Sequence, residues 1–131
     1  MPLRARGGLL TIHLIIKLKN NTMRDNRFRL NKSEIETGQE GHLDNIADIM
    51  LTNPAYKLTL KIHLDTDEVA NPKVQELDRL RGESVKKYLK TKGIDGGRIT
   101  FNLMKDTQPK SKGETDLSKA KNRRIKFVLS K

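Results

Sequence analysis

Residues 57–89, from Lys57 to Leu89, decide the fold and read KLTLKIHLDTDEVANPKVQELDRLRGESVKKYL. The first eight residues alternate strictly between two kinds of side chain. One set is apolar, namely Leu58, Leu60, Ile62 and Leu64, and the other is polar, namely Lys57, Thr59, Lys61 and His63. Alternation with a period of two is typical of a half-buried strand. We therefore predict a strand with one face in the core and the other face in solvent.

An acidic turn, Asp65 to Glu68, follows this strand and leads into a predicted helix. The helix begins near Asn71-Pro72, ends before Gly93, and has apolar residues at steps of three to five, namely Val74, Leu77, Leu80, Val85, Tyr88 and Leu89. Asp67 then lies where the strand ends, and Arg81 lies within the helix. A carboxylate and a guanidinium that converge on one cleft would form a receptor for a zwitterion.

Upstream of this stretch, the sequence predicts two strands and a helix. Alternating apolar residues indicate one strand from Leu10 to Leu18, and Phe28 and Leu30 indicate a short second strand. The helix covers residues 41–50, and Thr37 with Glu40 would form a capping box at its start.

Downstream, we expect two further strands separated by a lysine-rich loop. The strands cover residues 98–103 and 124–129, and a short helix at residues 117–121 precedes the second one. Their inward side chains would be Ile99, Phe101, Leu103, Ile125, Phe127 and Leu129. The pattern predicts an α+β fold: a two-layer α/β sandwich with a mixed sheet of four to five strands and helices packed on one face. A doubly wound sheet would need strands that are apolar on both faces.

Composition narrows the classes of function. The chain has 131 residues, which is the size of one domain, and 27 Lys and Arg against 16 Asp and Glu give a net charge of +11. This charge favours anionic neighbours without choosing among them. There is no cysteine, so disulfides and thiolate chemistry are excluded. No apolar run reaches the ~20 residues of a membrane span. The run from Leu9 to Ile16, which follows the basic leader, is interrupted by Thr11 and His13 and has no small-residue cleavage site after it, so we do not expect a signal peptide.

Several segments together resemble the C-terminal OmpA-like peptidoglycan-binding domain. They are Leu60-Lys61-Ile62 leading into Thr66-Asp67, Leu77 with Arg81 four residues on, Gly93-Ile94 with Arg98 after it, and Asn122-Arg123-Arg124-Ile125. The resemblance covers residues 23–131 and leaves residues 1–22 as a basic leader with an N-terminal strand. It implies a binding module, not an enzyme, that needs no cofactor.

The resemblance also implies a ligand and a location. The family holds the cell wall in the periplasm by gripping the diaminopimelate of the peptidoglycan stem peptide. The gripping roles fall on Asp67 and Arg81 here, with Thr66 and Arg124 as further contacts. An ammonium would bind the aspartate, and the arginine fork would hold a carboxylate through two parallel bonds. Such a domain is tethered to the outer membrane through its parent protein and has other envelope proteins as partners.

This chain departs from the family pattern around the expected site. Leu64-Asp65 replaces the usual Gly-His, so glycine's close backbone approach is lost, and Asp65 adds a carboxylate that would compete for Arg81. The family's serine and alanine fall on Asp78 and Gly82, and the loop between the gripping residues is one residue shorter. These departures favour an alternative, in which the module has lost wall binding and serves as a scaffold or docking domain.

Each site residue also has a structural explanation. Asp67 would cap a helix, Arg81 would form a salt bridge on a mixed helix face, and Arg124 would support the start of a strand. His13, His42 and His63 lack the spacing of metal ligands.

A third class is a nucleic-acid-binding module. The basic side chains that the sequence places on the outer face of the sheet are Lys57, Lys61, Arg98, Arg124 and Lys126. Sheets that bind single-stranded RNA stack bases on outward aromatic rings, whereas Phe101 and Phe127 are expected to face inward. Nucleic acid is therefore the least favoured partner.

Overall fold

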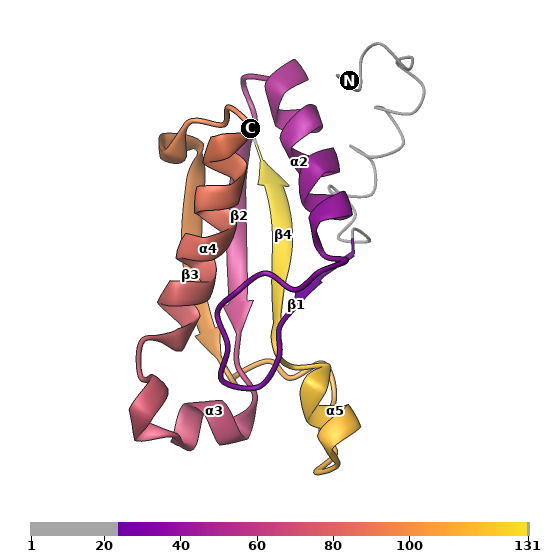
Figure 1. Ribbon diagram of the computed structural model, residues 1–131, viewed down its shortest axis with the longest axis vertical. Helices are drawn as coiled ribbons and strands as arrows, with labels where there is room; N and C mark the ends of the chain where they lie inside the picture. Colours follow the sequence, from indigo (N-terminus) through magenta and orange to yellow (C-terminus); the bar gives the residue numbers. More distant parts are fainter. Residues whose placement is uncertain (1–23, 131) are drawn as a thin grey trace.

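The computed structural model describes residues 24–130, which form two layers: a sheet, and helices that cover one face of it (Figure 1). Within these residues the sheet has four strands, in the order β1-β4-β2-β3. Their bounds are β1 Asn26–Arg27, β2 Lys57–His63, β3 Ile99–Lys105 and β4 Arg124–Ser130. β2 pairs in parallel with β3 and antiparallel with β4, so the predicted mixed sheet is confirmed. The strand predicted for Leu10 to Leu18 lies outside the described residues.

The central strand β2 has the inner face that its alternation predicts. Leu58, Leu60, Ile62 and Leu64 are buried. The register places Leu60 opposite Phe127 and Ile62 opposite Ile125 on β4, so apolar side chains meet directly across the ladder. Phe127 is 1% exposed and Phe101 packs against the same core, as predicted.

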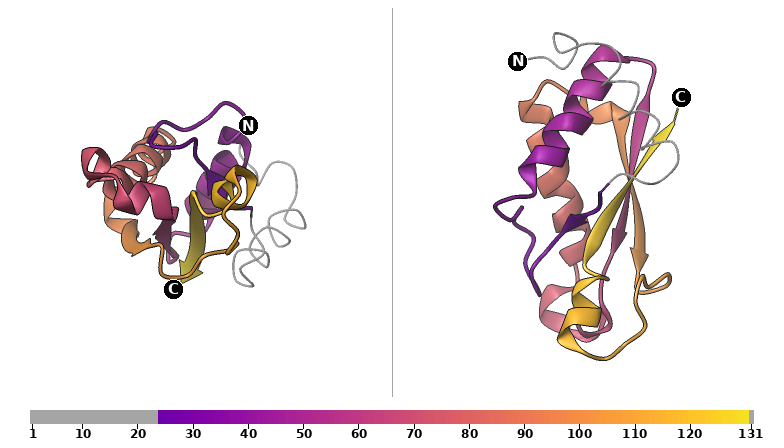
Figure 2. Two further views of the ribbon diagram at one scale, coloured as in Figure 1. Left: turned by 90° about the horizontal axis from the view of Figure 1, so that it is seen from below. Right: turned by 90° about the vertical axis from the view of Figure 1, so that its right-hand side faces the viewer.

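Two long helices, α2 (Glu40–Thr52) and α4 (Leu77–Thr91), lie side by side on this inner face (Figure 2). Each helix buries one apolar stripe against the sheet, with Leu43, Ile46 and Met50 on α2 and Leu77, Val85 and Leu89 on α4. The Tyr88 hydroxyl donates to Asp44 at 2.7 Å and joins the two helices, and this bond raises the pKa of Tyr88 to about 12. After α4 the chain turns at Gly93, whose φ of +99° suits a glycine at a helix end.

Short helical segments complete the chain. α3 (Thr66–Ala70), η2 (Pro72–Val74), η3 (Gly96–Arg98) and α5 (Asp116–Ala120) are all turns or single-turn helices. The helix that we predicted to begin at Asn71-Pro72 is therefore wrong at its start. Asn71 instead caps the separate turn η2 with its side chain, and α4 begins at Leu77.

Four further expectations are corrected. The predicted capping box of Thr37 and Glu40 is absent, because α2 begins at Glu40 with Gln39 as its N-cap, and Gly38, between Thr37 and the helix, has a φ of +98°. The short strand predicted at Phe28 and Leu30 lies instead at Asn26–Arg27, and Leu30 beyond it is 46% exposed. Leu103, which was expected to face inward, is 45% exposed on the edge strand β3. Arg98 does not face outward, since its guanidinium donates to the carbonyls of Met50, Asn53 and Tyr56 at and just beyond the end of α2.

Candidate functional site

Arg81 lies in the interior, beneath the loop that connects β1 to α2. Its side chain is fully buried, which is unusual for an arginine. Nη1 donates to Glu68 Oε1 at 2.9 Å and Nη2 to Glu68 Oε2 at 2.5 Å, which is the bidentate geometry of an arginine–carboxylate pair. Nε donates to the Lys32 carbonyl at 2.8 Å and Nη2 also donates to the Arg29 carbonyl at 3.1 Å. Four of the five N–H donors of the guanidinium are therefore used within the protein.

Glu68 joins Arg81 to two other segments. Its Oε2 accepts the Asn31 backbone N–H at 2.8 Å, and its Oε1 lies 3.3 Å from the Asp65 backbone N–H. Asp65 in turn accepts the Glu68 N–H at 2.7 Å, so the two residues form a capping box at the start of α3. Both side chains are fully buried, and the cap is Asp65, not Asp67.

Asp65 is engaged by Arg123, so the carboxylate that we expected to compete for Arg81 pairs elsewhere. Arg123 Nη1 lies 3.0 Å from Asp65 Oδ2, and Arg123 Nε donates to the Phe28 carbonyl at 3.1 Å. Phe28 also packs its ring 4.9 Å from the Arg81 guanidinium carbon. Asp65, Glu68, Arg81 and Arg123 thus form one network, which we call the buried ionic cluster.

Asp67 lies on the outside of α3 and does not contact Arg81. Its carboxylate is 56% exposed and binds the Lys119 ammonium, with Nζ 3.2 Å from Oδ1 and 3.0 Å from Oδ2. The hydrogen bond to Asp67 raises the pKa of Lys119. Thr66, the first residue of α3, is exposed beside Asp67. The structure therefore pairs both expected gripping residues with internal counter-ions and not with each other.

Arg124 is buried at the start of β4, next to His63 across the ladder. Its Nη2 donates to the Gln108 carbonyl at 3.2 Å and its Nε lies 3.6 Å from Asp25 Oδ2, and desolvation lowers its pKa. His63, which we expected in solvent, is 2% exposed. Its burial, with Arg124 close by, lowers its pKa to about 4. Among the described residues, neither ring nitrogen of His63 nor Arg124 Nη1 has a hydrogen-bond partner.

A hollow of about 380 Å³ borders the loop whose backbone bonds the buried ionic cluster. One wall is the loop from Asn31 to Glu34, and the other runs from Pro72 through Leu77 to Leu80. The Asn31 N–H and the Lys32 carbonyl, which bond Glu68 and Arg81, belong to this wall. A molecule in the hollow would therefore be separated from Arg81 by a single stretch of loop.

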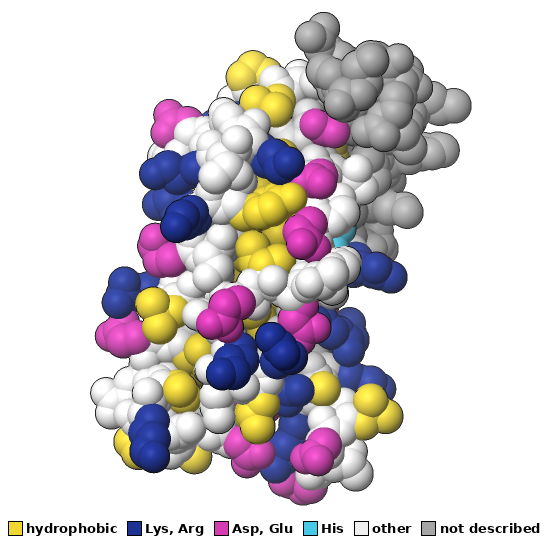
Figure 3. All heavy atoms as spheres, viewed as in Figure 1, with side chains coloured by type: hydrophobic (Ala, Val, Ile, Leu, Met, Phe, Trp, Pro, Cys, Tyr) yellow, Lys and Arg dark blue, Asp and Glu magenta, His cyan; other side chains and the backbone are white. Residues whose placement is uncertain are grey.

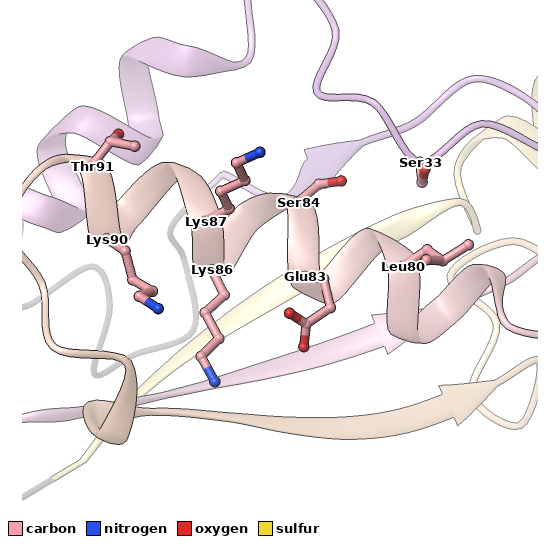
Figure 4. Close-up of a pocket in the computed structure, with 8 residues that line it drawn as sticks. All are labelled: Ser33, Leu80, Glu83, Ser84, Lys86, Lys87, Lys90 and Thr91. Carbon is pink, nitrogen blue, oxygen red and sulfur yellow. The ribbon is translucent and has the colours of Figure 1, made fainter.

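A second, open groove of about 610 Å³ continues along α4 from Ser33 and Leu80, which border both depressions. Figure 4 shows Ser84 and Lys87 pointing to the side of the helix on which Ser33 lies, while Glu83, Lys86 and Lys90 point to the other side. The groove presents hydroxyls and ammonium groups, which suit polar and anionic ligands.

Sequence reasoning missed Glu68 and Arg123 as partners of the expected site. One signal was present for the burial of Arg81: Leu77, Arg81, Val85 and Leu89 are spaced by four, so the arginine lies on the apolar stripe of its helix. The spacing of Asp65 and Glu68 is that of a capping box, but no pattern identifies Arg81 and Asn31 as the other partners of Glu68, because they lie 13 and 37 residues away in the chain.

The described residues offer neither a metal site nor a membrane-spanning helix. Within residues 24–130, no group of three or more His, Asp or Glu side chains stands ready to hold a metal ion. No helix in that part of the chain has the length and apolar character needed to cross a bilayer.

The fold places the chain in a class of small α+β domains with solved representatives. The peptidoglycan-associated lipoprotein from Burkholderia pseudomallei superposes with a TM-score of 0.71 at 19% identity, over 82% of this chain and 90% of that one. The C-terminal domain of Helicobacter pylori MotB superposes with a TM-score of 0.73 at 18% identity, over 82% and 86%. These likenesses concern the fold alone.

The sequence identifies the family. Residues 27–123 match the OmpA family, and the chain belongs to it. Outer membrane porin F of Pseudomonas fluorescens is 29% identical over 77% of this chain, and the peptidoglycan-associated lipoprotein of Buchnera aphidicola is 27% identical over 84%. The aligned parts are 31% and 61% of those two proteins, so this chain spans only part of the length of each relative.

Proposed function

We propose that this domain binds peptidoglycan without a covalent bond and anchors an envelope protein to the cell wall. The observation that carries the proposal is the similarity, over 84% of the chain, to a protein named a peptidoglycan-associated lipoprotein. On this proposal, the domain lies in the periplasm and is tethered to the outer membrane through the rest of its protein or complex. Its partners are the wall and other envelope proteins.

The proposed ligand group is the diaminopimelate of the stem peptide, held by Asp67 and Arg81 with Thr66 and Arg124 as further contacts. This group carries an ammonium and a carboxylate on one carbon. The Lys119 ammonium contacts both oxygens of Asp67. This contact supports the assignment of the ligand ammonium to Asp67, because it too joins an ammonium and a carboxylate. The pair of Arg81 with a carboxylate supports the assignment of the ligand carboxylate to Arg81.

Sedimentation with purified wall tests the proposal. The domain is expected to pellet with diaminopimelate-type peptidoglycan and to be released by free diaminopimelate, whereas lysine-type wall does not compete. Asp67→Asn removes the charge that receives the ammonium and is expected to weaken binding more than tenfold, since losing one partner of a charge pair that the bound ligand shields from water costs ~2–5 kcal/mol.

Lys119→Gln is the matched control. It breaks the same internal ion pair as Asp67→Asn but leaves the carboxylate free, so binding is expected to persist or strengthen. Equal pelleting of the wild type and Asp67→Asn would remove Asp67 from the site. Absence of the wild-type domain from the pellet would contradict wall binding itself.

One observation favours a second function. Arg81 is fully buried, so the free domain exposes no guanidinium at this position. An OmpA-family module with that arrangement would serve as a scaffold or docking domain in an envelope complex. This second function predicts that neither the wild type nor any variant that frees Arg81 pellets with purified wall.

A further inference from the structure

The guanidinium of Arg81 already holds a carboxylate in the free domain. Glu68 offers both of its oxygens to the two terminal nitrogens of Arg81, at 2.9 Å and 2.5 Å. This is the arrangement in which an arginine binds a carboxylate from a ligand. A ligand carboxylate therefore cannot reach the fork while Glu68 is in place.

We infer that Glu68 is an internal substitute for the ligand carboxylate, and that the wall peptide binds Arg81 by exchanging with it. This inference rests on the proposed function. Glu68 then determines the affinity of the site, because its carboxylate must leave the fork before the ligand enters.

For the exchange to occur, the loop that covers the buried ionic cluster has to move. Glu68 Oε2 accepts the Asn31 N–H, and the guanidinium donates to the carbonyls of Arg29 and Lys32. The same loop forms one wall of the 380 Å³ hollow. Asn31 has a φ of +61°, a left-handed conformation that is uncommon for residues other than glycine. Displacement of residues 29–32 toward solvent would open this wall of the hollow onto Arg81.

The ammonium half of the site has its own internal substitute, but a weaker one. Lys119 pairs with Asp67 just as Glu68 pairs with Arg81. The Asp67 side chain is 56% exposed, however, whereas the side chains of Glu68 and Arg81 are fully buried. Exposed ion pairs contribute little because water competes with both partners. A buried pair holds its geometry far more strongly. Glu68, not Lys119, is therefore the group that limits ligand entry.

The decisive variant is Glu68→Gln. Glutamine keeps a carbonyl oxygen that can accept the Asp65 N–H but removes the charge that competes for Arg81. Affinity for a soluble stem peptide containing diaminopimelate, measured by titration calorimetry, is expected to rise at least fivefold. Arg81→Lys keeps the charge and loses the fork, so it is expected to lose binding in either background.

A measurement on the wild-type protein avoids dependence on the folding of that variant. In nitrogen–proton correlation NMR spectra, the Asn31 amide N–H reports on its bond to Glu68, and the Arg81 guanidinium Nε–H reports on its bond to the Lys32 carbonyl in the loop. Titration with the same stem peptide is expected to shift both signals in proportion to occupancy. The Gly41 amide, on the exposed side of α2, serves as the reference and should not move.

The outcomes separate the two proposals. Binding with unmoved Asn31 and Arg81 signals, or equal affinity of the wild type and folded Glu68→Gln, overturns the exchange and leaves wall binding intact. Binding by Glu68→Gln alone supports the exchange and contradicts wall anchoring by the wild type. If neither protein binds, both proposals fail.

Discussion

The role of Arg81 follows from the groups that its buried guanidinium bonds. The cost of burying a guanidinium is offset here by one carboxylate, two backbone carbonyls and the face of the Phe28 ring. The sequence predicted the position of Arg81 on a helix beyond an acidic turn. It could not predict the partner, because Glu68 reaches Arg81 only after α3 and α4 fold against each other.

His63 supplies a prediction about pH. Its pKa is lowered from 6.5 to about 4, mainly by burial and then by Arg124, with Lys126 and Lys61 acting in the same direction and Asp25 opposing them. The unfolded chain takes up this proton near pH 6.5, whereas the folded protein does so only near pH 4. The contribution of neutral His63 is therefore complete above pH 6.5 and is lost progressively as the pH falls toward 4.

The measurement is the free energy of unfolding by urea at neutral pH and at roughly pH 4.5, where His63 is expected to account for a decrease of about 1–3 kcal/mol. His63→Gln should remove this part of the decrease. His42, whose pKa is also lowered by burial, with Arg24 adding to the effect, should retain its own part in that variant. A pH profile unchanged by His63→Gln would contradict the burial of an uncharged ring.

At the scale of elements, α4 is fixed on the sheet by the small size of one residue. Gly82 lies on the face of α4 that crosses β2 and β3. A Cβ atom there would lie 2.7 Å from Ile62 Cδ1 and 2.9 Å from Phe101 Cε2. Glycine costs a helix stability, so its presence in mid-helix is explained by this close approach.

Two glycine substitutions test the packing of the helices. Gly82→Ala is expected to lower the free energy of unfolding by about 1–2 kcal/mol, because overpacking exceeds the gain in helix propensity. Gly41→Ala, on α2 with nothing near its Cβ position, is the control and should raise that free energy by about 0.5–1 kcal/mol. Chemical denaturation of both variants gives the comparison, and stabilisation by Gly82→Ala would show that α4 does not pack this closely.

At the scale of the whole molecule, the buried ionic cluster joins segments from both ends of the described chain. Arg123 connects the start of β4 to Phe28 and to Asp65, and Glu68 with Arg81 extends the connection to the loop before α2. The short strand β1 pairs with β4 through only two residues. The cluster therefore supplies much of the attachment that β1 alone cannot provide.

Asp65→Asn tests this attachment. Asparagine is also a good N-cap, so the variant preserves the cap of α3 and removes the ion pair with Arg123. The free energy of unfolding is expected to fall by about 2–4 kcal/mol, because Arg123 loses its partner in a largely buried site. Asp67→Asn in the same helix breaks only the exposed pair with Lys119, and a change of less than about 1 kcal/mol is expected. Equal losses in thermal or urea unfolding would contradict a structural role for the cluster.

The net charge of +11 does not form a single basic face over the helices. Figure 3 shows acidic and basic side chains interspersed there, around an apolar strip between α4 and α2. Arg98 and Arg124, which we counted on the outer face of the sheet, instead donate to backbone carbonyls. The expected surface for a polyanion is therefore reduced to residues such as Lys57, Lys61 and Lys126.

The sequence by itself determined the order of the two long helices and of strands β2, β3 and β4, the inner faces of β2 and β4, and the turn at Gly93, because these depend on local periodicity and backbone preference. It also determined the OmpA family, through motifs in a fixed order. Tertiary structure alone decided which carboxylate pairs with Arg81, that His63 is buried, and which groups Arg98 and Arg123 bond. Those outcomes depend on contacts between residues 13 to 95 positions apart in different elements, and a periodic pattern carries no information about them.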